Sequence, residues 1–300
     1  MNIKHFTQSF VGLIGVSVLL ANSALATPII MSGDYVRTAI SDDGTLGYGS
    51  SASPGLLHDA TGTGTFADDY LTPGSPWEIF SVFSNEASLQ VNNNSSSDSI
   101  SGVLTDTSGA SPYDFAVNWA GTYGSSYTIS TETYFNTGDE RIGFTTTITA
   151  LSDLSGLQFL RAIDPDPDVQ SYSDYSTING RGNGSLAAND WVHAEGASTG
   201  LTLGLYSDSA VTHNTGVSSN WSQTPATYLS GIDDGNGDYT IGLAFDIGTL
   251  LTGNSVSLTY YYVMGDSLDN VDIPVDVPEP TSLAILALGL VGLGMRRKKV

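Results

Sequence analysis

Residues 241–247 read Ile-Gly-Leu-Ala-Phe-Asp-Ile, and residues 256–262 read Val-Ser-Leu-Thr-Tyr-Tyr-Tyr. In both stretches every second residue is apolar, which is the period of a β-strand with one buried face. Residues 87–91, 115–119 and 201–205 alternate in the same way. β-Branched and aromatic residues are frequent in these runs, and Gly, Asn, Asp, Ser or Pro bounds each of them. All five are therefore predicted strands.

The region between residues 27 and 272 has space for about a dozen such strands, and no part of it sustains a helical period. Residues 136–139 lie between two strand-like runs and predict a hairpin turn, and residues 233–238 predict another. The fold class is therefore all-β, a large antiparallel β-sandwich over residues 27–272. Two smaller sandwiches that meet in the loop-rich region 164–189 are the alternative.

The composition excludes several classes of protein. The chain has 300 residues, with 31 acidic residues against nine basic ones and no cysteine, so it has no disulfide scaffold, thiolate nucleophile or Cys-ligated zinc. Its net charge of −22 argues against a nucleic-acid partner, because phosphate binding depends on Lys and Arg. Between residues 27 and 280 lie four arginines, no lysine and all 31 acids, a net charge of 4 − 31 = −27.

The first 26 residues have the layout of a secretory signal peptide. Lys4 lies in a short polar start, residues 10–20 form an apolar run, and Ala24 and Ala26 form an A-x-A cleavage box. We expect export through the Sec machinery and removal of this signal helix, so that the mature chain begins at Thr27.

The C-terminal end combines prolines, a short apolar run and a cluster of cations. Residues 273–280 contain three prolines and predict a stiff tether, and residues 281–295 predict a single hydrophobic helix. This helix would be roughly 22 Å long, shorter than a hydrocarbon core of about 30 Å, so we expect it to hold the chain in the inner membrane only transiently. The cations that follow should stay in the cytoplasm; they are Arg296, Arg297, Lys298 and Lys299.

Pro278-Glu279-Pro280, the apolar run and the basic end together resemble a PEP-CTERM sorting signal. In that family, exosortase, a membrane-embedded transpeptidase-like enzyme, recognises the tail and removes or exchanges it near the PEP motif. The resemblance implies a chain exported across the inner membrane of a Gram-negative bacterium that makes exopolysaccharide. It also implies a final location at the cell surface or in the extracellular matrix.

One segment alternates three carboxylates with two prolines directly after a strand-like run; the carboxylates are Asp164, Asp166 and Asp168. Proline restricts φ to near −65°, so the segment is rigid, and oxygens at positions 1, 3 and 5 begin the Ca²⁺ cage of EF-hands. The sixth and twelfth positions depart from that pattern. We therefore predict a non-EF calcium site completed by loop carbonyls, Asp174 or Asn179. The alternative is a solvated acidic turn whose charge Arg161 offsets.

The same spacing recurs at Asp234, Asn236 and Asp238, within a glycine-rich turn. A second calcium site is one interpretation of this segment. Asn and Gly also suit the positive φ angles of a hairpin turn, which is the other.

Residues 55–78 contain the mixture of side chains that suits a sugar cleft. Trp77 would stack on a pyranose ring, while Asp68, Asp69 and Glu78 would accept hydrogen bonds from hydroxyl groups. The alternative is a long surface loop that Trp77 and Phe80 anchor in the core.

These features predict a non-enzymatic surface or matrix protein, sorted by exosortase, that binds calcium or exopolysaccharide. The alternative is a carbohydrate-active enzyme, a glycan lyase, hydrolase or mutarotase-like sandwich, with the acid/base candidates His58, Asp68, Asp69, Glu78 and His193. An enzyme of this kind requires a His and two acids around one point. A structural or adhesion subunit that associates through strand edges is a third interpretation. The body also resembles an uncharacterised secreted β-sandwich module, which implies a fold but no reaction.

Overall fold

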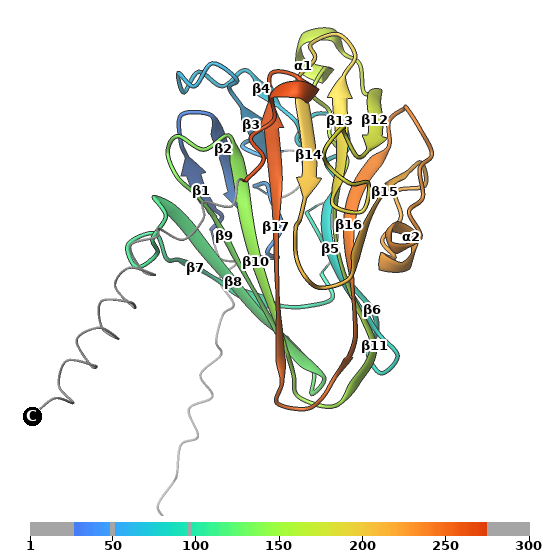
Figure 1. Ribbon diagram of the computed structural model, residues 1–300. Helices are drawn as coiled ribbons and strands as arrows, with labels where there is room; N and C mark the ends of the chain where they lie inside the picture. Colours follow the sequence, from blue (N-terminus) through green and yellow to red (C-terminus); the bar gives the residue numbers. More distant parts are fainter. Residues whose placement is uncertain (1–26, 49–51, 95–97, 275–300) are drawn as a thin grey trace, which may run out of the picture.

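A computed structural model describes residues 27–48, 52–94 and 98–274 (Figure 1). These residues form seventeen strands and three short helices, and the strands make three antiparallel sheets. The predicted all-β class is confirmed. The predicted signal helix at 1–26 and the sorting helix and basic end at 281–300 lie outside the described residues. None of the described helices has the length and hydrophobicity needed to cross a bilayer.

The largest sheet has eight strands in the spatial order β12-β13-β14-β17-β10-β9-β8-β7. Residues 136–139 form the tight turn of its β9–β10 hairpin, as predicted. The strands are β7 (Gly102–Asp106), β8 (Phe115–Tyr123), β9 (Tyr127–Phe135), β10 (Arg141–Ala150), β12 (Thr177–Arg181), β13 (Trp191–Gly196), β14 (Thr202–Tyr206) and β17 (Ser255–Gly265).

The second sheet has five strands in the order β15-β16-β11-β5-β6, and a small third sheet has the order β1-β2-β3-β4. The five strands are β5 (Glu78–Ser84), β6 (Ser88–Asn93), β11 (Leu154–Ile163), β15 (His213–Ser218) and β16 (Thr240–Leu250). The small sheet contains β1 (Ile29–Ser32), β2 (Val36–Ile40), β3 (Leu56–His58) and β4 (Asp68–Asp69). The helices are α1 (Val169–Tyr172), α2 (Pro225–Leu229) and the 3₁₀ helix η1 (Leu268–Asn270).

The two large sheets enclose one apolar core. On β17, Leu258, Tyr260 and Tyr262 are buried, whereas Thr259 and Tyr261 between them are partly exposed. The predicted alternation at 256–262 is therefore the pattern of a strand with one face on the core. Side chains from all three sheets belong to the same buried cluster, which makes the body a β-sandwich.

The five-stranded sheet is covered on both faces. Its outer face carries a second apolar cluster, in which Tyr228 of α2 joins Leu160, Ala162 and Ala244 (Figure 1). Residues 241–245 of β16 are consequently all buried, although their alternation predicted one exposed face. A five-residue helix is too short to produce a helical period in the sequence, so this cover was not predicted.

Strands from both sides of the region 164–189 enter each large sheet. In the eight-stranded sheet, β7–β10 precede this region, β12 lies within it, and β13, β14 and β17 follow it. The region therefore does not divide the body into two sandwiches. The loop at 233–238, predicted as a hairpin turn, is instead the end of a longer β15–β16 connection that includes α2.

A fully buried ion pair lies between the sheets. Arg161 of β11 and Glu78 of β5 pair through Nε and Oε1, and both side chains are 0% exposed. The Tyr262 hydroxyl of β17 and the backbone N–H of Leu46 each donate a hydrogen bond to the Glu78 carboxylate at 2.8 Å. The Arg161 guanidinium also lies 4.7 Å from the centre of the Phe144 ring, in cation–π range. The Arg161 side chain is thus part of the core, and the interpretation that it offsets the charge of a solvated acidic turn is wrong.

We expect Glu78→Gln to lower the free energy of unfolding by about 3–5 kcal/mol, because it leaves the Arg161 charge buried and unpaired. Urea unfolding measures this loss. The double variant E78L/R161M should recover most of it, since an apolar pair of similar volume carries no desolvation cost.

Asp272→Asn is the matched control, because Asp272 pairs with Arg141 at 2.5 Å where both side chains are partly exposed. This change should cost less than about 1 kcal/mol. Equal losses from Glu78→Gln and Asp272→Asn would contradict the central role of the buried pair.

Candidate metal centre

The candidate site begins where β11 leaves its sheet. Residues 164–166 continue the strand as an extended segment, because Asp164 and Asp166 each precede a proline and such residues are restricted to extended conformations. The segment is held by hydrogen bonds from Asp164 N–H to the Trp77 carbonyl and from Asp166 N–H to the Tyr70 carbonyl, both at 2.9 Å. Side chains two residues apart on extended backbone point to the same side, so Asp164 and Asp166 present their carboxylates together.

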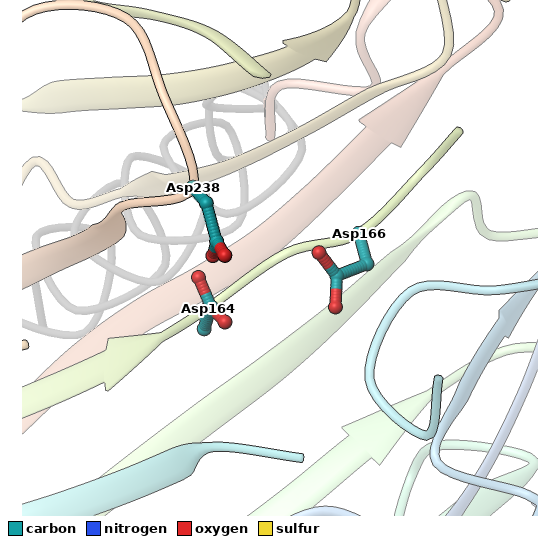
Figure 2. A group of neighbouring side chains, drawn as sticks. All are labelled: Asp164, Asp166 and Asp238. Atoms are coloured by element: carbon teal, nitrogen blue, oxygen red, sulfur yellow. The ribbon is translucent and has the colours of Figure 1, made fainter. Parts of the chain in front are cut away.

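Asp238 joins them from the loop that precedes β16. One carboxylate oxygen from each of Asp164, Asp166 and Asp238 lies within 4.8 Å of the other two, and Figure 2 shows the three groups converging on one space. Asp164 and Asp166 are each 4% exposed, whereas Asp238 is exposed to solvent. Oδ1 of Asp166 is buried and has no hydrogen-bond partner.

The pairing of strands explains this convergence. Ile163, the last residue of β11, lies opposite Ile241 at the start of β16. The segment that leaves β11 and the loop that enters β16 therefore lie at the same end of the sheet. No single stretch of sequence contains this information, although the antiparallel pairing of the two strands would have placed both acidic segments together.

Burial and mutual repulsion disfavour negative charge at this cluster. Burial, with the Asp238 charge in addition, raises the pKa of Asp164 to about 8. Burial and the charges of Asp164 and Asp238 raise the pKa of Asp166 to about 9, and burial also raises the pKa of Asp238. A bound cation would reverse these shifts, because it stabilises the ionised carboxylates.

The carboxylates open onto a cavity of about 280 Å³, whose other walls include Gly74, Ser75, Tyr175 and Trp221. Trp221 has a φ of +51°, which is rare for a bulky residue. Its indole N–H donates to the Asp238 carbonyl at 3.2 Å, and its ring meets Trp77 edge-on at 5.9 Å. Oxygen ligands without His or Cys suit a hard divalent cation such as Ca²⁺ or Mg²⁺.

Asp168, the third carboxylate of the predicted calcium set, has a different role. It accepts hydrogen bonds from the N–H groups of Ser198 at 2.7 Å and Thr199 at 3.1 Å, and from the Thr199 hydroxyl. Asp168 therefore holds the β13–β14 loop and is not among the converging carboxylates. Of the three predicted residues, Asp164 and Asp166 lie in the converging group, and its third member is Asp238.

The other predicted calcium ligands also bind protein groups. Asp174 accepts a hydrogen bond from Ser176 N–H, and the Asn179 amide donates to the carbonyls of Gly235 and Gly237 at 3.2 Å. Of the second predicted set, Asp234 accepts two bonds from Ser219 and Asn236 accepts one from Asn179 N–H. Only Asp238 of that set reaches the site.

The predicted sugar cleft of Trp77, Asp68, Asp69 and Glu78 does not form. Trp77 is buried in the outer cluster with Trp221, while its neighbour Glu78 is in the main core. Asp69 is 1% exposed and accepts hydrogen bonds from several backbone N–H groups, including that of Gly55. Asp68 contacts only the Ser171 hydroxyl among the hydrogen bonds described, at 3.3 Å.

The two histidines proposed as acid/base groups lie in different sheets. His58 of β3 is enclosed between the Tyr70 hydroxyl at 2.7 Å and the Glu140 carboxylate at 2.6 Å. His193 of β13 is 6% exposed and stacks beside Trp191, and burial lowers its pKa to about 4. The described residues do not gather His58, His193 and Glu78 around a common point.

Among the solved structures that resemble the chain, one supports the fold. The chain is similar to a bacterial glucoamylase solved in complex with acarbose, with a TM-score of 0.53 and 11% identity over 80% of this chain and 32% of that one. A TPR-domain containing protein from Parabacteroides distasonis matches with a TM-score of 0.48 and 13% identity over 85% of this chain and 50% of that one. The chain thus spans only a third to a half of these proteins, and the likeness at this identity is one of fold alone. No curated relative matches the chain in sequence.

The C-terminal residues match a known signal. Residues 276–298 match the PEP-CTERM protein-sorting motif, which includes the predicted Pro278-Glu279-Pro280 tripeptide and the basic residues up to Lys298. These residues lie outside the described structure. The motif marks its bearer for export and for sorting by exosortase to the cell surface of Gram-negative bacteria. The chain is therefore a β-sandwich protein that carries a PEP-CTERM sorting motif.

Proposed function

We propose that this chain is a non-enzymatic surface or matrix protein that binds a divalent cation, Ca²⁺, through Asp164, Asp166 and Asp238. The observation that carries the proposal is the buried Oδ1 of Asp166, which lacks a protein partner in a cluster of three carboxylates. A buried acceptor normally has a hydrogen-bond partner. A cation at this point would supply one for Asp166 and offset the repulsion among all three groups.

Calcium is favoured over other cations by the ligands and by the compartment. Ca²⁺ binds six to eight oxygens in flexible geometry, whereas Mg²⁺ needs near-ideal octahedral geometry. The carboxylates come from two separate segments, of which the one with Asp164 and Asp166 is buried and the one with Asp238 is exposed. Such a set suits Ca²⁺, which tolerates more varied geometry than Mg²⁺. An exported body meets calcium in the range where extracellular sites bind it, with dissociation constants of about 10⁻⁴–10⁻³ M.

The surface location follows from the sorting motif, and the finer assignment to an exopolysaccharide layer remains part of the proposal. The exported region lacks lysine and carries a net charge of −27 from 4 − 31 charged residues. Such a body stays soluble and is repelled by anionic lipid surfaces. Divalent cations would mediate the contacts of this acidic body with other components of the layer.

A glycan lyase, hydrolase or mutarotase-like enzyme is the alternative function. Its support is the similarity in fold to a glucoamylase. The candidate acid/base groups are engaged elsewhere, with Glu78 bound to Arg161 and His58 held by Tyr70 and Glu140. These contacts favour binding over catalysis.

We expect millimolar CaCl₂ to raise the Tm of the purified protein. At 10 mM calcium and a Kd of about 10⁻⁴–10⁻³ M, binding stabilises the folded state by about 1.4–2.7 kcal/mol, which for a body of this size corresponds to roughly 3–10 °C. Asp238→Asn should remove most of this shift, because it deletes the exposed ligand without opening the core. Thermal unfolding in CaCl₂ and in EDTA measures the effect.

Asp234→Asn is the control from the same loop, because the Asp234 carboxylate binds Ser219 instead of the cluster. It should lower the Tm slightly and leave the calcium shift intact. A wild-type Tm that is the same in calcium and in EDTA would contradict the proposed cation site.

We expect the stability of the calcium-free protein to fall as pH rises from about 5 to about 9. The unfolded pKa of an aspartate is about 3.9, whereas those of Asp164 and Asp166 in the folded state are about 8 and about 9. Over this range the folded state binds more protons than the unfolded state, so the free energy of unfolding declines with pH. Urea unfolding in EDTA checks the slope, and the double variant D164N/D166N should flatten it. A wild-type slope equal to that of the double variant would contradict the assignment.

We expect the mature protein from its native host to end near Pro278, because exosortase processing acts near the PEP motif. Mass spectrometry of the intact protein determines the C-terminus. Glu279→Ala should leave the basic end attached, and a substitution in the tether, Val275→Ala, should not. Retention of Val300 in the mature wild-type protein would contradict processing of the tail.

A further inference from the structure

We infer that the cation at Asp164, Asp166 and Asp238 holds an uncharged sugar through two neighbouring hydroxyl groups, with Tyr175 and Trp221 against the sugar ring. This inference rests on the proposed cation site and names what that site binds. It differs from the predicted cleft of Trp77, Asp68, Asp69 and Glu78, since it shares none of those residues.

The three carboxylates alone do not complete the coordination of a calcium ion. Three carboxylates supply between three and six oxygens, and Ca²⁺ takes six to eight. The other groups that line the cavity add no further carboxylate, so the remaining positions face the cavity of about 280 Å³. Hydroxyl oxygens of a bound molecule are suitable hard ligands for those positions. Two hydroxyl groups on neighbouring carbons of a sugar can bind one ion without distortion of the sugar ring.

Two aromatic side chains, Tyr175 and Trp221, form walls of the cavity. Trp221 is fixed by its hydrogen bond to the Asp238 carbonyl and by its contact with Trp77. Tyr175 is 42% exposed, and its ring packs so closely on Gly74 that a Cβ at that glycine would lie 2.6 Å from Cε1. Two positioned aromatic rings beside a polar cluster form the mixture of apolar wall and few polar groups that small-molecule sites use. The C–H face of a pyranose fits such a wall.

The charge of the site favours an uncharged ligand. Three carboxylates and one Ca²⁺ leave a net charge of about −1 at the site. No arginine lines the cavity, and residues 27–280 contain no lysine. An acidic sugar would therefore be repelled, and an uncharged one is favoured. A cavity at the small end of the range for ligand sites, about 300–1,000 Å³, suits one sugar residue at the end of a chain.

Affinity chromatography on agarose derivatised with mannose, galactose or glucose tests the inference, with galacturonate-agarose as the charged comparison. In millimolar CaCl₂ we expect at least one neutral resin to retain the protein and EDTA to release it. Tyr175→Ala should weaken retention roughly tenfold, the loss of one aromatic contact. Tyr172→Ala is the matched control, because Tyr172 is 59% exposed on α1 and does not line the cavity.

The outcomes separate this inference from the proposed function. A calcium-dependent Tm without retention on any neutral resin overturns the sugar site and leaves the cation site standing. Retention that persists in EDTA, or that is stronger on galacturonate, also overturns it. Equal retention of Tyr175→Ala and Tyr172→Ala refutes the aromatic wall. A Tm that is insensitive to calcium contradicts both the proposed cation site and the inferred sugar site.

Discussion

The buried pair of Arg161 and Glu78 is the constraint on which the rest of the sandwich depends. Two charges removed from water are tolerated only when each finds its partners in fixed positions. Here the partners come from all parts of the fold: both charges lie on the five-stranded sheet, Tyr262 belongs to the eight-stranded sheet, and Leu46 lies in the connection between β2 and β3 of the small one. The three sheets must therefore assemble together around the pair. This requirement also fixes the end of β11, from which the acidic segment departs three residues later.

The two groups of buried ionisable side chains in this protein differ in the partners that surround them. Glu78 has a guanidinium and two hydrogen-bond donors in contact, so its charge is neutralised from within the chain. Asp164 and Asp166 have one another and Asp238, and burial with repulsion raises their pKa values. Burial of such a cluster without an opposite charge destabilises the folded state. Its location at the rim of the sheet, open to a cavity with aromatic walls, is what points to a ligand from outside.

Features that neighbours in sequence decide were predicted correctly, whereas features that depend on distant residues were not. The β9–β10 turn and the inward face of β17 follow from residue type and period. The complete burial of residues 241–245 depends on α2, which packs on the sheet from outside and is too short to be seen as a period. The sugar cleft could have been questioned from the sequence alone, because Trp77 and Glu78 are adjacent, and adjacent residues on a strand point to opposite faces.

The sequence by itself determined the all-β class and the sorting motif, and it predicted an export signal, because each of these is encoded in continuous stretches of chain. It also indicated that Asp164 and Asp166 share one side of a rigid segment. Only the tertiary structure decided that Asp238 joins them while Asp168 binds the loop at Ser198. The reason is the antiparallel register of β11 and β16, which brings carboxylates more than seventy residues apart to the same end of one sheet.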